Sequence, residues 1–497
     1  MRLTRGSQIP GRLRQCLAHC ALVMSFFFTS SCAEVKRSII GTAVDSPIAM
    51  ASHPTLATTY VLNAVLGAEY DLGSLHSYSL SASTGPQLLA SEEAPRLGTA
   101  LAVAKSGAFL IAGFSGTIPE LHVYKIDAQG IARRSELSTD RVRLSSGRIG
   151  TIQLTKLVNQ QDWFVIVSFA DRTFDAQVMM LRYSETSGFQ KLLASPADFY
   201  TPSRESLLGA YTLAYGSPIV FENLGLLVAF PYGTLGYYGA NPSAFDWLTG
   251  QVVLPNASSD LRTVSALLVD LNRLGSSNVS ANLALGFVPI AFNKDGKTGN
   301  PNLERSAEDN ATFAFRTGYQ SALSIDASGS KCQPTAPLSA LAAHTAVVAL
   351  NNQTADLIAL GGFDHVARQL RERLDKGESQ PILGSVLSPQ PISVTAESSE
   401  QDFKMLVPQI QLIQSGSLCT LAWLKVEQRR SSLGLERSWL QIATAEANMK
   451  QLEIESRITG LASFAVSGSK ILTGSFGTNQ VQQLDFDGSS IKEGEIR

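Results

Sequence analysis

The sequence of 497 residues contains no apolar run long enough to cross a membrane, and it is poor in charge. The apolar run at residues 21–28 is far shorter than the ~20 residues that span a bilayer. Charged residues make up 16% of the chain, against about 25% in an average protein, and the net charge is −2. This balance gives no indication of a nucleic-acid partner.

Motifs for catalysis, metals and nucleotides are also scarce. The 6 histidines are too scattered for a metal site, and no Gly-x-Ser-x-Gly nucleophile motif occurs. Residues 291–298 fit a loose phosphate-binding loop, but Pro301 follows where a helix is needed. Asp295 and Lys297 have the spacing of a calcium loop, yet Lys297 places a cation where an oxygen ligand belongs. We therefore expect no cofactor, no metal and no bound nucleotide, and no catalytic residue is singled out.

The N-terminal segment has the composition of an export signal. Residues 1–31 contain four arginines and no acidic residue, and the apolar run is followed by small residues and Cys32. This arrangement resembles a bacterial lipoprotein signal, in which the cysteine is lipidated after cleavage. The resemblance implies lipidation of Cys32 and, because Ala33 follows, anchoring to the outer membrane on its periplasmic or surface face. Thr29 departs from the family pattern, so ordinary cleavage after Ala33 stays open as an alternative.

Cysteine use is consistent with an oxidising compartment. Cys16 and Cys20 lie in the signal segment, which leaves Cys332 and Cys419 in the exported part besides Cys32. Two thiols in such a compartment predict a disulfide between Cys332 and Cys419. Two unpaired cysteines remain the alternative, because sequence does not place the two residues within bonding distance.

A recurring hairpin pattern dominates the rest of the chain. Residues 97–130 read as a short apolar strand, a Gly/Pro turn and a strand of alternating polarity. The same pattern recurs at residues 63–85 and 470–488, and Leu-His-x-Tyr occurs at Leu75 and again at Leu121, 46 residues later. Further short apolar segments, which we call apolar starts because each could begin a new repeat, follow at intervals of roughly 45 to 70 residues. This is the period of propeller blades with insertions.

We therefore expect an all-β fold, a β-propeller of about seven blades, with six to eight possible. Single stretches resemble kelch and FG-GAP repeats, namely residues 357–366 and 97–113. The expected organisation is a signal at 1–31, a tether or closing strand at 32–55, and the propeller at 56–497. Residues 300–313 and 379–402 are predicted to be polar loop insertions, and residues 364–377 one short amphipathic helix.

His76 and His122 occupy equivalent positions of this repeat. Their strand parity is opposite to that of their apolar neighbours, which predicts that both side chains point outward as surface residues.

The richest local feature is an aromatic stretch at residues 230–247, interspersed with glycine and proline. One interpretation is a folded-back loop that plugs the propeller. The functional interpretation is a platform for a protein or glycan of the cell envelope, since rigid rings give a large contact area at little entropic cost. The candidate partner-binding residues are Tyr232, Tyr237, Tyr238, Phe245 and Trp247.

Taken in combination, these features favour a membrane-anchored exported lipoprotein that acts as a binding or scaffolding module. The alternative is a propeller hydrolase or lactonase with its site in the central channel, so whether the protein is an enzyme stays open. An enzyme would show several carboxylates or histidines converging in the channel.

Overall fold

The computed structural model describes most of the chain from residue 44 to residue 496. The described residues are 44–64, 72–81, 85–144, 149–158, 160–169, 178–194, 214–232, 244–246, 251–253, 261–274, 285–293, 304–305, 313–314, 317–325, 333–334, 344–350, 355–360, 363–376, 386–387, 392–394, 403–416, 418–429, 437–443, 451–454, 461–476 and 478–496.

The first part of the chain forms three antiparallel sheets, each from consecutive strands. The first consists of β1 (Pro47–Ser52), β2 (Thr58–Asn63), β3 (Gly73–Ser79) and β4 (Gln87–Ala94). The second consists of β5 (Gly98–Val103), β6 (Phe109–Phe114), β7 (Glu120–Ile126) and β8 (Ala132–Arg134), with β9 (Arg141–Arg143) also paired to β7. The third consists of β10 (Ile149–Thr155), β11 (Trp163–Phe169), β12 (Val178–Ser184) and β13 (Gly188–Ala194).

Four more sheets follow in chain order. The fourth contains β14 (Ala214–Phe221), β15 (Leu226–Tyr232), β18 (Leu261–Asp270), β19 (Leu285–Asn293) and the parallel strand β26 (Val386–Leu387). The fifth contains β22 (Thr317–Ile325), β24 (Thr345–Leu350), β25 (Ala355–Leu360) and β27 (Ile392–Val394). The sixth contains β28 (Phe403–Ser415), β29 (Leu418–Arg429), β30 (Arg437–Ala443), β31 (Gln451–Ile454) and the parallel strand β23 (Gln333–Pro334). The last contains β32 (Leu461–Ser467), β33 (Lys470–Ser475), β34 (Gln480–Phe486) and β35 (Ile491–Ile496).

The remaining described elements are short. Two small hairpins pair β16 (Ala244–Asp246) with β17 (Gln251–Val253) and β20 (Glu304–Arg305) with β21 (Phe313–Ala314). The helical elements are η1 (Ser138–Asp140), η4 (Glu222–Leu224), α3 (Leu271–Leu274) and α5 (Phe363–Asp375).

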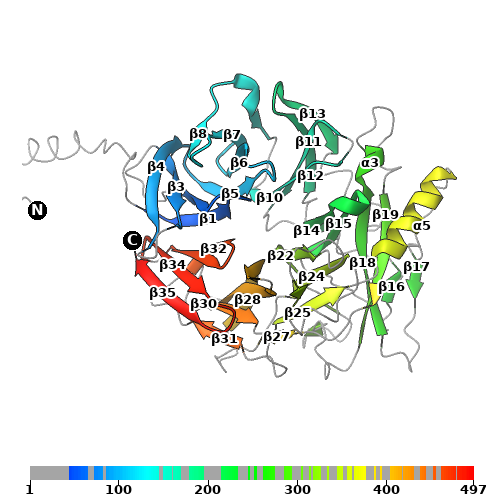
Figure 1. The fold of residues 1–497 in the computed structure, drawn as a ribbon. Helices are drawn as coiled ribbons and strands as arrows, with labels where there is room; N and C mark the ends of the chain where they lie inside the picture. Colours follow the sequence, from blue (N-terminus) through cyan, green and yellow to red (C-terminus); the bar gives the residue numbers. More distant parts are fainter. Residues whose placement is uncertain are drawn as a thin grey trace, which may run out of the picture.

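The sheets are arranged as the blades of a propeller (Figure 1). Among the described residues, the innermost strands β1, β5, β10, β22, β28 and β32 each contact the next, and β32 contacts β1, so a ring of six blades closes. The fourth sheet packs between the third and fifth: β14 contacts β22 on one side and β11 and β12 on the other. The all-β propeller is confirmed. The ring has six blades, which is one fewer than the estimate of about seven and within the expected range of six to eight.

Most of the apolar starts in the sequence correspond to the second strand of a sheet, for example β6, β11, β15, β24, β29 and β33. The start near residue 281 is different, because β19 is the fourth strand of the fourth sheet and begins no blade of its own. The stretch at 379–402 also differs from a plain loop insertion, since it supplies β26 and β27 to two sheets. The helix expected at 364–377 is observed as α5.

Burial between blades explains why the second strands are continuously apolar. In β6 and β11 every residue is buried, because both faces of a blade are covered by its neighbours. One cluster joins Phe109 and Ile111 of the second blade to Trp163 and Tyr183 of the third, with Phe109 and Trp163 packed edge to face. Comparable clusters join the third sheet to the fourth, the fifth to the sixth, the sixth to the last, the last to the first and the first to the second.

A chain of hydrogen bonds links three neighbouring blades at one end of the ring, which we call the collar end. The Ser46 N–H donates to the Asn479 side chain at 2.8 Å, which links the first blade to the last. The Ala64 N–H donates to the Ser46 carbonyl, and the Leu97 N–H donates to the Ala64 carbonyl, both at 3.0 Å. The Ser115 N–H in turn donates to the Leu97 carbonyl at 2.9 Å. These bonds connect the last, first and second blades without a shared strand.

The sixth and last blades are connected by side-chain amides. Gln409 donates to the Phe464 carbonyl at 2.7 Å and accepts from the Phe464 N–H at 3.0 Å. Gln411 repeats the pattern, donating to Phe464 and accepting from the Val466 N–H at 3.1 Å. The amides satisfy backbone groups of β32 that have no strand partner on this side.

The disulfide between Cys332 and Cys419 stays a prediction, because Cys332 lies outside the described residues. Cys419 is buried at the start of β29. The Cys419 backbone pairs with Pro334 in the parallel ladder of β23 and β29, and Leu418 pairs with Gln333, which directly follows Cys332 in the sequence. This register is compatible with the predicted bridge.

Candidate functional site

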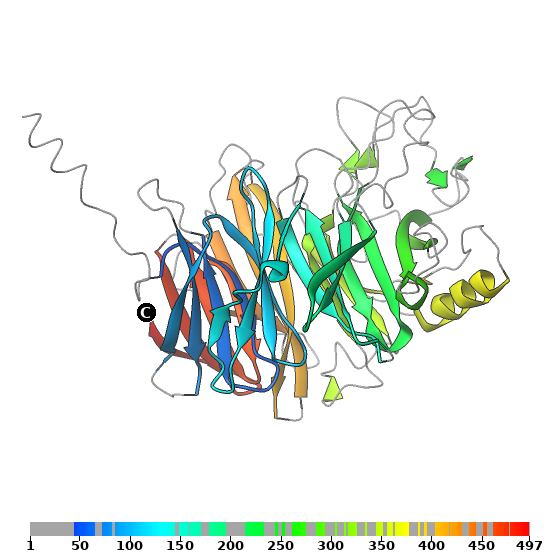
Figure 2. The same cartoon turned by 90° about the horizontal axis from the view of Figure 1, so that it is seen from above.

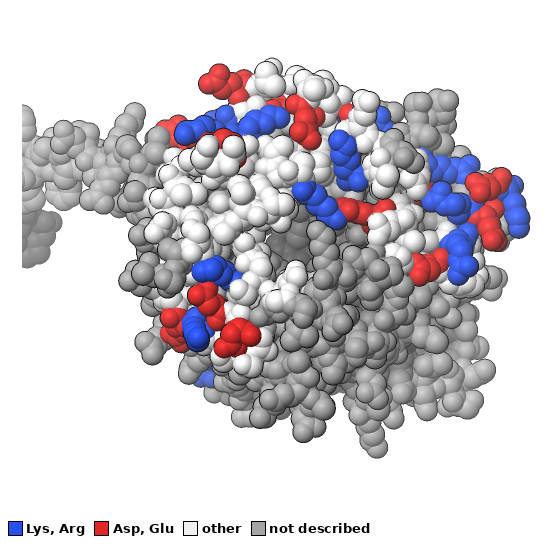
Figure 3. Space-filling view, viewed as in Figure 1, with Lys and Arg blue, Asp and Glu red and all other residues white. Residues whose placement is uncertain are grey.

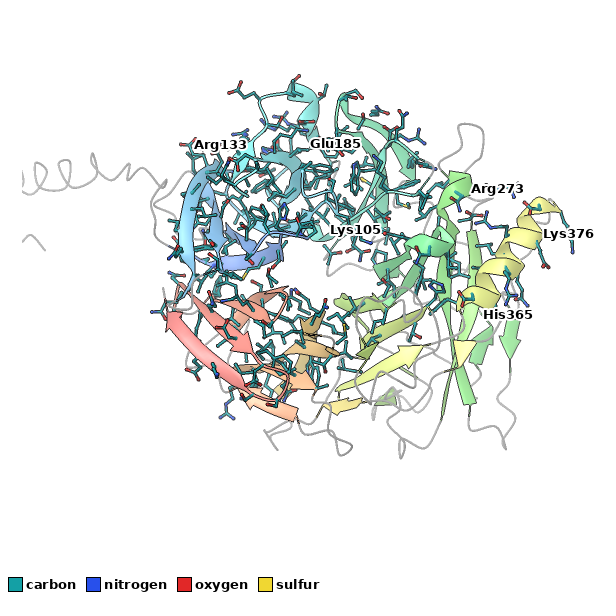
Figure 4. All side chains as sticks on the ribbon, in the orientation of Figure 1. Lys105, Arg133, Glu185, Arg273, His365 and Lys376 are labelled. Atoms are coloured by element: carbon teal, nitrogen blue, oxygen red, sulfur yellow. The ribbon has the colours of Figure 1, made fainter. Side chains whose placement is uncertain are left out.

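A polar group lies at the mouth of the central channel, at the end opposite the collar. It is formed where first and second strands of blades connect: Lys105 follows β5, Thr155 ends β10, and Glu222 lies in η4. Lys105 donates to one carboxylate oxygen of Glu222, and the Thr155 hydroxyl donates to the other at 3.1 Å. Figure 4 places Lys105 beside the central opening, and Figure 3 shows a hollow there with basic and acidic side chains beside it.

This group bridges elements that are distant in sequence. Lys105 belongs to the second blade and Glu222 to the fourth sheet, 117 residues later. The Lys105 side chain is 69% exposed, so the ion pair contributes only about 0–1 kcal/mol to stability. Chemically it presents an ammonium group and a carboxylate to solvent at the channel mouth.

Contacts between neighbouring turns continue around this end. The ring of His53 bonds through Nε2 to the Gly107 carbonyl at 3.2 Å, and its Nδ1 accepts from the Leu56 N–H at 2.9 Å. Gly107 has φ +73° and leaves no room for a side chain beside His53. Burial lowers the pKa of His53, and the hydrogen bond to the Gly107 carbonyl, which would raise it, only partly offsets this effect. His53 therefore serves as a neutral spacer between two turns.

Helix α5 packs at the end of the ring where Lys105 and Glu222 pair. Figure 2 shows the helix and the β16–β17 hairpin on opposite sides of the molecule. His344 Nε2 lies 3.2 Å from a carboxylate oxygen of Asp364, and Phe363 stacks at 4.8 Å on Phe221. Arg371 of the helix approaches Asp270 at 3.6 Å. These contacts attach the helix to the fourth and fifth sheets, and its exposed Arg368 faces solvent.

The expectation that His76 and His122 are surface residues is wrong. His76 is 0% exposed and His122 is 2% exposed. Their parity was interpreted correctly as opposite to that of the apolar neighbours, but in a propeller the opposite face packs on the preceding blade. His76 lies between Ser74 and Tyr78, within 3.2 and 3.3 Å of their hydroxyls, on the face toward the last blade.

His122 is part of a charged cluster at the outer part of the second blade. Glu120 accepts from His122 Nε2 at 2.9 Å and forms a bidentate pair with Arg141, and Arg143 also donates to it. A carboxylate only accepts, so Nε2 carries the proton of His122. The other nitrogen, Nδ1, is buried without a hydrogen-bond partner.

This arrangement keeps His122 neutral and Glu120 charged. Burial lowers the pKa of His122, and the bond to Glu120 only partly offsets it. Burial alone would raise the pKa of Glu120, but the hydrogen bonds from His122, Arg141 and Arg143 outweigh it and lower the value. The cluster fixes β9 to β7, where His122 lies opposite Arg141.

A second polar cluster lies between the second and third blades, at the outer rim near Glu185 (Figure 4). Lys125 donates to the Tyr183 hydroxyl at 2.9 Å and lies 3.5 Å from Asp140, which also accepts from the Ser135 hydroxyl at 2.6 Å. Burial raises the pKa of Tyr183, so the phenol stays protonated. The cluster ties η1 and β7 to β12.

A third pair is fully enclosed in the sixth blade. Lys425 and Glu427 are 1% and 0% exposed, with their charged atoms 3.8 Å apart, and the Lys425 ammonium lies 4.5 Å from the Trp439 ring centre. Enclosed ions are costly unless well paired, so these side chains are tightly constrained by their surroundings.

The residues proposed from sequence lie mostly beyond the described part of the chain. Cys32, Tyr237, Tyr238 and Trp247 are outside it. For Tyr232 in β15 and Phe245 in β16 only the backbone is described. Sequence reasoning missed Lys105 and Glu222, because no motif connects two residues so far apart.

Within the described ranges, no three His, Cys, Asp or Glu side chains gather closely enough to hold a metal ion. The described helices include none with the length and hydropathy needed to span a bilayer.

Several solved structures are similar to this chain at low sequence identity. No protein-family model matches the chain, and no curated protein matches it. The β-propeller domain of Cps50 from Myceliophteria thermophila is similar over 88% of this chain and 96% of its own, with 8% identity and a TM-score of 0.47. The closed ring of sheets described above makes this chain a β-propeller.

Two other propeller-like neighbours show the breadth of the likeness. Saccharomyces cerevisiae Sqt1 matches 92% of this chain and 86% of its own, with 10% identity and a TM-score of 0.42. The periplasmic gluconolactonase PpgL of Pseudomonas aeruginosa matches 91% and 84%, with 11% identity and a TM-score of 0.34. At such identities and TM-scores, these likenesses do not indicate a function for this propeller.

The buried state of His122 predicts a pH-dependent stability. Its pKa in the folded protein is below the value of about 6.5 in the unfolded chain, so the unfolded state binds the proton first as pH falls. The contribution of neutral His122 to the free energy of unfolding is therefore fully present above pH ~6.5. It decreases as the pH is lowered further, by at most about 1.4 kcal/mol per pH unit for one site. His122→Gln, which keeps a donor for Glu120, is expected to give a shallower loss of melting temperature from pH 7 to 5.

The matched control is His365→Gln, at an exposed position of α5. It should leave the pH slope unchanged. Equal slopes for wild type and His122→Gln would contradict the account.

Proposed function

We propose that this propeller is a binding or scaffolding module of the bacterial cell envelope, exported and held at the outer membrane by lipid on Cys32. The observation that carries the proposal is how the described ionisable groups between blades are used. His53, His76 and His122 bond to the turns and strands that surround them, and the partly exposed Lys125 donates to Tyr183 of the next blade. Groups used to hold blades together favour a rigid platform over a reaction centre.

The alternative function, hydrolysis in the channel, draws on the polar group at the channel mouth. Glu222 is the carboxylate there that could act on a substrate. Its two oxygens are already bonded to Lys105 and Thr155, which lowers its availability as an acid or base. The binding function is therefore preferred.

The partner surface that we propose is the loop between β15 and β18, which includes the β16–β17 hairpin. It follows a second strand, as the collar turns do, so it emerges at the collar end of a rigid sheet. Its aromatic residues are the kind that carry most of the binding energy in protein interfaces.

Lipidation of Cys32 is tested by cell fractionation. Cys32→Ser is expected to move the protein from the membrane fraction to the soluble fraction, because the acyl chains would be lost. Metabolic labelling with a fatty acid should mark the wild type and leave the variant unmarked. Absence of label in the wild type, together with unchanged fractionation of the variant, would refute the anchor.

Partner binding by the loop is tested with Tyr237→Ala, Tyr238→Ala and Trp247→Ala combined. We expect capture of a cell-envelope protein or glycan to weaken at least tenfold, since one or two lost aromatic anchors cost ~1.4 kcal/mol or more. The melting temperature should stay within about 2 °C of the wild type if the rings lie outside the core. A variant that unfolds would show that the rings are core residues that plug the propeller.

A further inference from the structure

Large exposed apolar side chains are concentrated at the collar end. Among the described residues, seven large apolar side chains are exposed. Four of them come from the last, first and second blades: Leu72 (38%), Leu97 (37%), Ile118 (52%) and Phe476 (37%). We call these four the collar patch.

The topology places all four at one end of the ring. Leu97 immediately precedes the inner strand β5, and Ile118 lies in the turn between β6 and β7. Leu72 precedes β3, and Phe476 follows β33. Within an antiparallel blade, the start of the first strand and the turn from second to third strand lie at the same end. The collar hydrogen bonds of Ser46, Leu97 and Asn479 confirm that these turns adjoin.

Leu97 occupies a backbone conformation that leucine rarely adopts. Its φ is +59°, in the left-handed region that favours glycine and asparagine. Its N–H and carbonyl both belong to the collar, which holds the backbone in place. A large apolar residue is thus kept exposed where a small or polar one would fit the backbone better.

The chain leading to Cys32 ends at the same place. Val44 is the first described residue, and Ser46, two residues later, is a member of the collar. Twelve residue steps separate Cys32 from Val44, which reach at most ~43 Å when fully extended. A lipid on Cys32 would therefore bring the bilayer within reach of the collar end, where the tether begins.

We propose that the collar patch docks on the surface of a lipid bilayer, with Leu72, Leu97, Ile118 and Phe476 inserted among the headgroups. This inference rests on the proposed lipid anchor, which keeps the collar end within reach of the bilayer. Exposed aliphatic and aromatic side chains gain free energy when they leave water at a membrane interface. The patch adds a second contact to the acyl anchor and keeps the collar end, from which the β15–β18 loop also emerges, toward the membrane.

The test uses Cys32→Ser protein, which lacks the acylation site, and vesicles of phosphatidylethanolamine with phosphatidylglycerol. The unacylated protein is expected to float with the vesicles. A combined variant, Leu72→Ser, Leu97→Asn, Ile118→Ser and Phe476→Ser, should lower its partition coefficient at least about tenfold. Leu97→Asn alone should lower it about two- to threefold without lowering the melting temperature, because asparagine tolerates positive φ.

The matched control changes two exposed apolar residues outside the collar patch. Leu137→Ser (52% exposed) lies between β8 and β9 on the outer edge of the second blade, and Val158→Ser (91% exposed) lies in the turn between β10 and β11 at the opposite end. This control should bind vesicles like the unmodified Cys32→Ser protein. Equal binding by the collar variant, equal loss in the control, or no vesicle binding at all would overturn the proposal. So would a collar variant that only converts a dimer to a monomer, since the patch would then bind a second copy. If the combined variant unfolds, Leu97→Asn alone decides.

Failure of the anchor and failure of the docking surface give different results. Wild-type protein without fatty-acid label, together with patch-dependent vesicle binding, refutes the anchor and leaves the docking surface supported. Labelled wild-type protein, together with vesicle binding that ignores the patch, refutes the docking surface and leaves the anchor supported.

Discussion

The junction between the first and last blades is the constraint on which the rest of the structure depends. The first and the last blade are each built from one consecutive stretch of chain, and no described strand of either blade joins the sheet of the other. Closure therefore relies on side-by-side packing of β1 and β32, on an apolar cluster around Met50 and Leu472, and on the bond from Ser46 to Asn479. Without closure, the outer faces of the first and last blades would meet water.

The same constraint explains where the polar groups are found. A blade in a closed ring has no free face, so histidines and charged residues on its third strand must find partners inside the contact between blades. His76 bonds with Ser74 and Tyr78, and His122 with Glu120, for this reason. Such groups stiffen the ring, and a stiff ring leaves its exposed loops and turns to meet partners or a membrane.

Much of the fold follows from local sequence, and the rest depends on distant contacts. The continuous apolar runs of β6 and β11 and the repeated Leu-His-x-Tyr of β3 and β7 predict the blades correctly. The burial of His76 and His122 was missed because parity alone does not tell whether the opposite face meets solvent or another blade. The run in β19 suggested a further blade because its apolar sequence is like that of the second strands, whereas β19 pairs with β18 and β26 inside the fourth sheet. The pair of Lys105 and Glu222 joins two turns that carry no motif, so only the closed ring brings them together.

Amide hydrogen exchange in β1 and β32 tests most directly whether the contact between the first and last blades closes the ring. Asn479 has φ +53° and accepts the Ser46 N–H, whereas Asn479→Ala removes the acceptor and strains the turn. The account predicts that Asn479→Ala lowers the free energy of unfolding by about 1–3 kcal/mol and speeds amide exchange in β1 and β32. Asn479→Asp keeps an acceptor oxygen, so its exchange should change little. Equal protection of β1 and β32 in wild type and Asn479→Ala would contradict it.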